Sequence, residues 1–238
     1  MITTMGQRIS FFKNNFNKGL KDLIFENFSA FRQWHLDSAK SSMEDLNEPY
    51  GNEILENYLH QENNLKKDFH KLDKRLIDEL TAKFVADYCD TTDGEGKILE
   101  FLEPSVNKWR YEASTEMVMQ TGDKDFVQFW NFLIRGRSLK DNADFDSYSN
   151  DFKIGFLTFD EHQLLKAKIE LYFGNPEQLK HNFWTEEEKL KEQNAIKDSK
   201  NGTYSLSGHN PKSSGLENVL QVLNQMTHEK NELITSIE

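Results

Sequence analysis

The chain of 238 residues has few of the features that mark secreted, membrane-spanning or disulfide-bonded proteins. Its single cysteine, Cys89, cannot form an intramolecular disulfide, which suits a reducing compartment. No apolar run reaches the length of about 18 residues that a transmembrane helix needs. Residues 1–10 lack the basic and apolar regions of a secretory signal. We therefore expect a cytoplasmic protein.

The motifs of common catalytic and cofactor sites are also missing. There is no G-x-S-x-G nucleophile motif, no glycine-rich phosphate loop and no H-E-x-x-H zinc motif. The seven histidines are scattered, without the paired spacing of a zinc site. Cys89 ends an apolar stretch that is predicted to be helical, where a thiolate is not favoured. The sequence therefore predicts a non-catalytic protein with no metal ion and no other cofactor.

Acidic residues, by contrast, are abundant. The chain has 40 Asp and Glu against 29 Lys and Arg, which gives a formal net charge of −11. Phosphate backbones repel such a chain, so we expect no direct binding of nucleic acid, whereas a basic protein partner fits the charge. Residues 1–40 are the exception, because six Lys and Arg outnumber three Asp and Glu. We expect this basic segment to pack on the acidic remainder and not on a membrane.

Apolar periodicity predicts a protein made mainly of helices. Eighteen Phe, seven Tyr and four Trp provide large apolar surfaces, and they argue against disorder. Spacings of three and four between apolar residues predict helices over residues 7–40, 49–59, 65–88, 113–121, 124–134, 158–173, 177–197 and 214–234. Short apolar stretches predict strands over 97–102, 106–111 and 152–157.

Capping residues mark several helix ends. Asp123 is predicted to cap the helix that follows it, and Gly136 is typical of the end of that helix. Thr158 with Glu161, and Ser214 with Glu217, have the spacing of a capping box.

These elements predict a helix-dominated α+β fold, in which N- and C-terminal helices flank a small mixed domain with a few short strands. The predicted division is a helical region over residues 1–71, a central α+β domain over 72–175 and C-terminal helices over 176–238. The polar, glycine-containing stretch 199–215 is predicted to be a flexible linker.

Two blocks of the central segment carry a resemblance to a known family. They are GDKDFVQFWNFLIRGRSL at Gly122–Leu139 and IGFLTFDEHQLLKAKIE at Ile154–Glu170, and EPSVNKWRYEASTEMV at Glu103–Val118 lies before them. Together they resemble YfbM-like bacterial proteins of unknown function and a related branch of small domains, over residues 72–173. The resemblance implies a compact α+β domain and no particular activity.

Two groups of acidic residues are candidates for binding a basic partner. Asp90, Asp93 and Glu95 follow a predicted helix, and Asp141, Asp144, Asp146 and Asp151 lie in and next to a polar loop. The first group lacks the alternate spacing and closing Glu of a calcium loop. Because complementary charge steers association, we predict a protein-binding protein. Its concrete form would be an immunity protein that neutralises a basic bacterial toxin.

A polar and aromatic cluster supports an alternative hypothesis. Cations, a carboxylate and an aromatic face would converge if the segments around residues 109–116 and 135–137 met in the fold. The candidate residues are Trp109, Arg110, Glu116, Arg135 and Arg137. Such a pocket would bind a planar or anionic small ligand, or form the site of an enzyme, although ion-pair networks that only stabilise a fold have the same composition.

Overall fold

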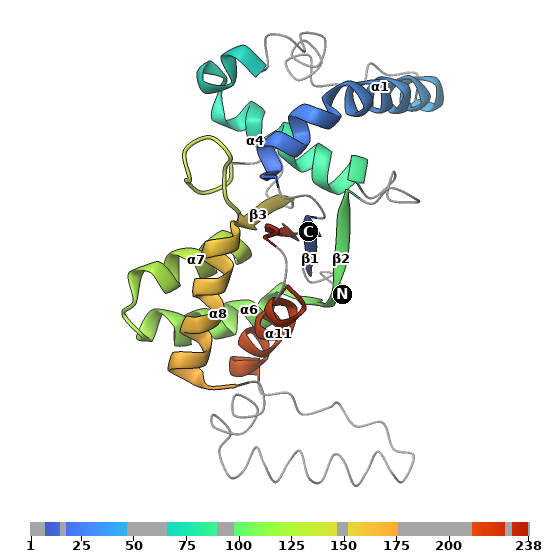
Figure 1. The fold of residues 1–238 in the computed structure, drawn as a ribbon. Coiled ribbons are helices and arrows are strands. Elements are labelled where there is room, and N and C mark those ends of the chain that lie inside the picture. The colour runs from blue at the N-terminus through green and yellow to red at the C-terminus, as the bar shows by residue number, and fades with distance from the viewer. Residues whose placement is uncertain are drawn as a thin grey trace, which may run out of the picture.

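A four-stranded antiparallel sheet lies at the centre of the computed structural model (Figure 1). The structure describes residues 8–14, 18–46, 66–89, 98–146, 152–175, 211–226 and 230–237. The strands are β1 (Arg8–Asn14), β2 (Leu99–Asn107), β3 (Lys153–Leu157) and β4 (Leu233–Ile237), in the spatial order β2-β1-β4-β3. The two central strands therefore come from opposite ends of the chain.

Both central strands correct the sequence prediction. Residues 8–14 were predicted to begin a helix, but they form β1, in which Ile9 and Phe11 are fully buried on one face. The final predicted helix was extended to Ile234, but α11 (Pro211–Gln225) ends nine residues earlier, and Ile234 lies in β4. Ile9 pairs with Ile237, and Phe12 pairs with Ile234. These pairings stabilise a strand where the local spacing alone favoured a helix.

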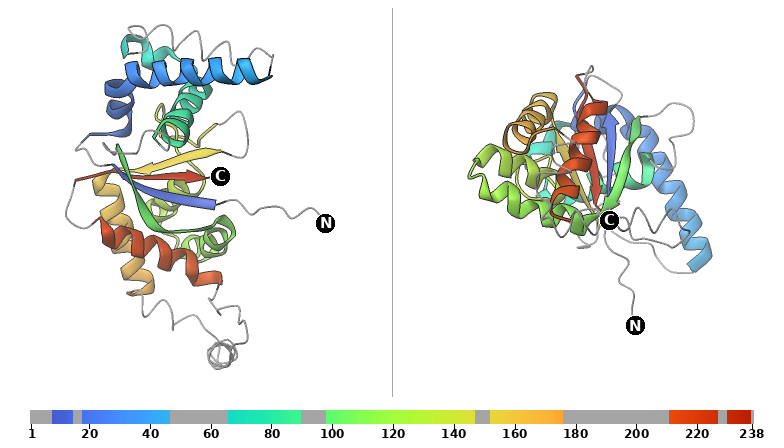
Figure 2. Two further views of the ribbon diagram at one scale, coloured as in Figure 1. Left: turned by 90° about the vertical axis from the view of Figure 1, so that its right-hand side faces the viewer. Right: turned by 90° about the horizontal axis from the view of Figure 1, so that it is seen from below.

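Helices cover both faces of the sheet, and each face has its own hydrophobic core (Figure 2). One face packs against α6 (Lys108–Gln120), α7 (Lys124–Ile134), α8 (Phe159–Phe173) and α11. The other packs against α1 (Leu20–Leu46), the 3-10 helix η1 (Phe69–Lys71), α4 (Lys74–Ala82) and the π-helix η2 (Lys83–Tyr88). Side chains of a strand alternate between its faces, so Ile9 and Phe11 enter the first core while Phe12 packs against the second. The predicted helix-dominated α+β class is confirmed.

The predicted ends of α7 and α8 are confirmed, whereas the helix predicted over 7–40 begins at Leu20 and continues to Leu46. The Asp123 side chain accepts a hydrogen bond from the Phe126 backbone N–H at 3.0 Å, and Thr158 and Glu161 form a capping box at the start of α8. Gly136 follows α7 with a φ of +93°. The Ser214 cap is wrong, because α11 begins at Pro211 and Ser214 lies inside it. Proline is well suited to the first turn, since its missing N–H would have no partner there.

The remaining predictions are corrected by the structure or concern residues that the structure does not describe. The strand predicted over residues 106–111 ends at Asn107, and Lys108 already belongs to α6. Residues 211–215 of the predicted linker are helical. The helices predicted over 49–59 and 177–197, and residues 199–210 of the linker, lie outside the described residues. The segments predicted as strands over 97–102 and 152–157 lie in one sheet as parts of β2 and β3, and β1 and β4 lie between them.

Gly155 lets the end of α7 pack directly on β3. A Cβ atom at this position would lie 2.2 Å from the Phe132 carbonyl oxygen and 2.4 Å from Thr235 Oγ1. Such distances are far below van der Waals contact, so any larger residue would push α7 away from the sheet. This close approach fixes the position of the last turn of α7 on β3.

Glu232, just before β4, holds the start of α1. Its Oε2 atom accepts a hydrogen bond from the Leu20 backbone N–H at 2.6 Å. The residue before Leu20 is Gly19, which has no side chain to act as a cap, so Glu232 takes that role. Burial raises the pKa of Glu232 from 4.5 to about 7. The hydrogen bond from Leu20 and the positive charge of Arg137 oppose this rise. The negative charges of Glu161 and Asp22 add to it.

Glu232→Gln should therefore remove a pH-dependent loss of stability. The carboxyl pKa is higher in the folded state, so its contribution is complete below about pH 4.5 and is lost as the pH rises through about 7. Each unit of pKa difference corresponds to about 1.4 kcal/mol, and residual solvent contact keeps the total loss below about 3 kcal/mol. Gln keeps an acceptor for Leu20 but carries no charge.

Urea unfolding at about pH 5 and about pH 8.5 measures this effect. His35, whose pKa falls to about 4 through burial and the nearby Lys83, titrates in the opposite sense. The quantity to compare is thus the difference between variant and wild type at each pH. Glu26→Gln, an exposed change on α1, is the control. An equal pH dependence of Glu232→Gln and wild type would contradict the assignment.

None of the helices in the described ranges is long and apolar enough to cross a membrane.

Candidate functional site

The loop between α7 and β3 carries three of the predicted partner-binding residues. We call residues Arg137–Asp146 the acidic loop. Asp141, Asp144 and Asp146 are all exposed on it. Four other predicted partner-binding residues, Asp90, Asp93, Glu95 and Asp151, lie outside the part of the chain that the structure describes.

Arg137 fixes the start of the acidic loop. It is only 5% exposed, and its Nη1 and Nη2 atoms donate to the two carboxylate oxygens of Glu161 at 2.6 and 3.0 Å. Nη1 also donates to the Phe156 carbonyl oxygen, while Nε and Nη2 donate to Asn142 Oδ1 at 3.2 and 2.9 Å. The guanidinium carbon lies 4.3 Å from the ring centre of Phe132 and 4.5 Å from that of Phe156. One side chain thus joins the loop, β3 and the start of α8.

The charge of Glu161 is stabilised by these contacts. Burial alone would raise the pKa of Glu161, but hydrogen bonds from Arg137 and the Thr158 backbone outweigh it and bring the pKa below its usual value. A bidentate arginine–carboxylate pair is among the strongest charge-assisted contacts in proteins. Arg137 and Glu161 therefore form a structural ion pair, and the guanidinium group is occupied by partners within the chain.

Asp78 of α4 fixes the other end of the acidic loop. This carboxylate is fully buried, and it accepts hydrogen bonds from Ser138 Oγ at 2.6 Å, the Asp146 backbone N–H at 2.8 Å and Lys74 Nζ at 2.9 Å. Burial raises the pKa of Asp78, and these three hydrogen bonds oppose the rise. Both ends of the loop thus bind one carboxylate from a helix on the opposite face of the sheet.

Contacts within the acidic loop complete its fixed shape. The Ser138 backbone N–H donates to the Ala143 carbonyl oxygen at 2.9 Å, and Asn142 adopts a φ of +50°, which asparagine tolerates better than most residues. Phe145 is buried in the core beneath α1 and α4. A loop held in this way loses little conformational entropy on binding, so it is preorganised to present its carboxylates.

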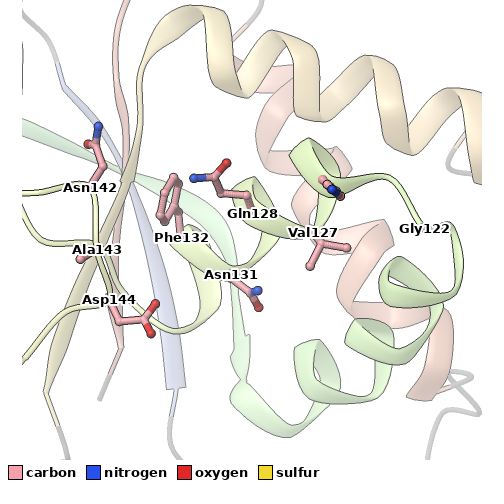
Figure 3. Close-up of a pocket in the computed structure, with 9 residues that line it drawn as sticks. Gly122, Val127, Gln128, Asn131, Phe132, Asn142, Ala143 and Asp144 are labelled. Atoms are coloured by element: carbon pink, nitrogen blue, oxygen red, sulfur yellow. The ribbon is translucent and has the colours of Figure 1, made fainter.

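A groove of about 580 Å³ lies between the acidic loop and α7 (Figure 3). Val127, Gln128, Asn131 and Phe132 line it from α7, together with Gly122 and Lys124 at the start of the helix. Asn142, Ala143 and Asp144 line it from the loop. The groove therefore combines apolar side chains, amide groups, one carboxylate and one ammonium group.

No family model, curated protein or solved structure matches this chain. The resemblance of the central segment to YfbM-like proteins stays a prediction. Within the described ranges, no three His, Cys, Asp or Glu side chains come together as metal ligands.

The residues of the alternative hypothesis are only partly brought together. Glu116 and Arg135 line a second hollow of about 490 Å³ between α6 and the end of α7, with Lys108, Glu112, Thr115, Met119 and Ile134. Arg137 does not reach this hollow, because it is buried against Glu161. The side chains of Trp109 and Arg110 lie outside the described residues. Thr115 Oγ1 is already bonded, since it accepts a hydrogen bond from Trp130 Nε1 at 3.0 Å and donates to the Tyr111 carbonyl oxygen.

Proposed function

We propose that this chain is a non-catalytic, cytoplasmic protein-binding protein, and that the acidic loop and the groove beside it bind a basic protein partner. The observation that carries the proposal is that a buried arginine and a buried carboxylate hold the loop in shape, while Asp141, Asp144 and Asp146 remain exposed. The three exposed carboxylates repel one another, and the two cations of the loop, Arg137 and Lys140, offset only part of this negative charge. A partner with complementary charge relieves that repulsion.

The form of this function that we propose is an immunity protein, which binds and neutralises a basic bacterial toxin. A net charge of −11 would accelerate association with a basic toxin, and the preorganised loop would lower the entropic cost of the complex. The test is co-purification with the product of an adjacent gene, combined with growth of cells that express that product. A protein that neither binds nor protects against any neighbouring product would refute the immunity function.

Replacing Asp141, Asp144 and Asp146 together by Asn tests the binding surface. We expect the association rate with the partner to fall by about tenfold at low salt, and by less at high salt, because electrostatic steering is screened. Surface plasmon resonance at two salt concentrations measures both rates. The matched control removes three carboxylates elsewhere, with Glu112→Gln, Glu116→Gln and Asp125→Asn, and it should associate nearly as fast as wild type.

A small-ligand site in the second hollow is the other candidate function. It is favoured by one observation, which is that Glu116 and Arg135 line the same hollow together with Lys108 and Glu112. If the loop variant bound the partner as well as wild type does, the acidic loop would not be the binding surface. Small-ligand binding would then become the leading candidate, and Arg135→Met should weaken binding of an anionic ligand, because it removes a cation that lines the hollow.

A further inference from the structure

The outer face of α8 carries an exposed apolar stripe. On its inner face this helix buries Leu165 and Ile169 in the core that it shares with α7 and α11 (Figure 1). On the opposite face, Leu164 is 45% exposed, Leu171 is 76% exposed, and Ala167 between them is also exposed. A single exposed apolar side chain is common on protein surfaces. Three at spacings of three and four on one helix face form a continuous stripe, which we call the α8 stripe.

The α8 stripe has a spacing that matches itself in reverse. Each helical residue turns by about 100° and rises by about 1.5 Å, so Leu164 and Leu171 lie within about 20° of one line and about 10 Å apart. In an antiparallel pair of α8 helices related by a two-fold axis beside Ala167, Leu164 of each copy packs against Leu171 of the other. The small Ala167 side chain lies near the axis and lets the two helices approach closely. The stripe is therefore self-complementary, as a contact between identical surfaces requires.

Charged side chains beside the α8 stripe match in the same arrangement. Lys166 and Glu170 lie on one flank of the stripe, and neither side chain forms an ion pair within the described ranges. In the antiparallel pair, Lys166 of one copy and Glu170 of the other differ in height by only about 1.5 Å along the helix axis. Two reciprocal ion pairs therefore form across the two-fold axis. Lys168, on the other flank, already donates to Asp123 at 2.6 Å, so its positive charge is balanced within each copy.

We propose that two copies of this chain form a homodimer in which the α8 helices pack antiparallel through the α8 stripe. A second copy supplies both the reversed spacing of the apolar side chains and the two reciprocal ion pairs by symmetry alone. Two helices of 15 residues bury less area than a standard protein interface, so we expect a dissociation constant in the micromolar range. The proposal uses none of the residues of the acidic loop, so it stands or falls independently of the proposed function.

Sedimentation velocity of the full chain over a range of concentrations tests the homodimer. We expect the mass to rise from that of one chain to that of two as the concentration increases. Leu171→Glu should weaken dimerisation at least about tenfold, because it places a carboxylate against Leu164 of the second copy. Met119→Glu is the matched control, since Met119 is also an exposed apolar residue but lies on α6, and it should dimerise as wild type does. A wild-type chain that stays monomeric, or a Leu171→Glu variant that dimerises as wild type does, would overturn the proposal.

Exchange of the two charges tests the antiparallel arrangement. Lys166→Glu and Glu170→Lys should each weaken dimerisation about fivefold, because each brings like charges together across the axis. The double variant should recover the affinity of wild type. An equimolar mixture of the two single variants should dimerise more strongly than either variant alone, because all four flanking charges then match. If the double variant and the mixture stayed as weak as the single variants, the antiparallel homodimer would be refuted. Circular dichroism confirms that each variant is folded.

Discussion

Arg137→Met is expected to reduce the free energy of unfolding by about 3–5 kcal/mol, because it breaks a buried ion pair by removing one partner. Methionine keeps apolar contact with the rings of Phe132 and Phe156, but it has no N–H to donate. The Glu161 carboxylate would be left partly buried without its cation, and Asn142 Oδ1 would lose both of its donors. Chemical denaturation monitored by circular dichroism measures the loss.

Arg135→Met is a closely matched control. This arginine lies two residues earlier, is exposed and lines the second hollow without an ion pair to a described residue. Its replacement should change the free energy of unfolding by less than about 0.5 kcal/mol. Adding Glu161→Gln to Arg137→Met should recover part of the stability, since the unpaired charge is removed while the side chain can still act in the cap of α8. A loss of under about 1 kcal/mol for Arg137→Met alone would show that Arg137 does not hold the loop.

The bounds of α7 and α8 could be predicted because the residues that specify them lie close together in the sequence. Asp123, Thr158 and Gly136 mark the ends of α7 and α8 within the residues that form them. The spacing of apolar residues then identifies the face that packs on the sheet. Local information of this kind does not show which strand lies next to which.

The two central strands could not be predicted for the same reason. In β1, Phe12 lies four residues before Phe16 and eight before Leu20, which favours a helix, although Ile9 and Phe11 also alternate as in a strand. All five residues of β4 are buried, so it lacks the alternation of buried and exposed residues that marks a half-exposed strand. Their pairing joins residues from the two ends of the chain, and only the fold brings these together.

The charged residues of the candidate site could be predicted from the sequence, but the buried contacts that hold the acidic loop in shape could not. A polar loop with several Asp residues indicated Asp141, Asp144 and Asp146. Asp78 lies 60 residues before its partner Ser138, in a helix on the other face of the sheet, so no local pattern links the two. Arg137 was a candidate ligand-binding residue, but its partner Glu161 is 24 residues later.

Asp78→Ala is expected to separate the shape of the acidic loop from its charge. The change removes a buried carboxylate with three hydrogen bonds, and it leaves the Ser138 hydroxyl and the Asp146 N–H without their acceptor. We expect a loss of about 3 kcal/mol in the free energy of unfolding. Amide hydrogen exchange over residues 138–146 should accelerate, because both ends of the loop lose their common attachment. Partner affinity should also fall, since a loosened loop must be ordered on binding.

Asp144→Ala provides the opposite pattern and completes the test. Asp144 has the same side chain on the exposed surface of the same loop, so its replacement should change the free energy of unfolding by less than about 0.5 kcal/mol. Hydrogen exchange in the loop should stay as in wild type, while partner affinity falls through the loss of a direct contact. If the Asp78 variant exchanged no faster over residues 138–146, the buried carboxylate would not be what shapes the loop, and the preorganisation on which the proposed function depends would need another cause.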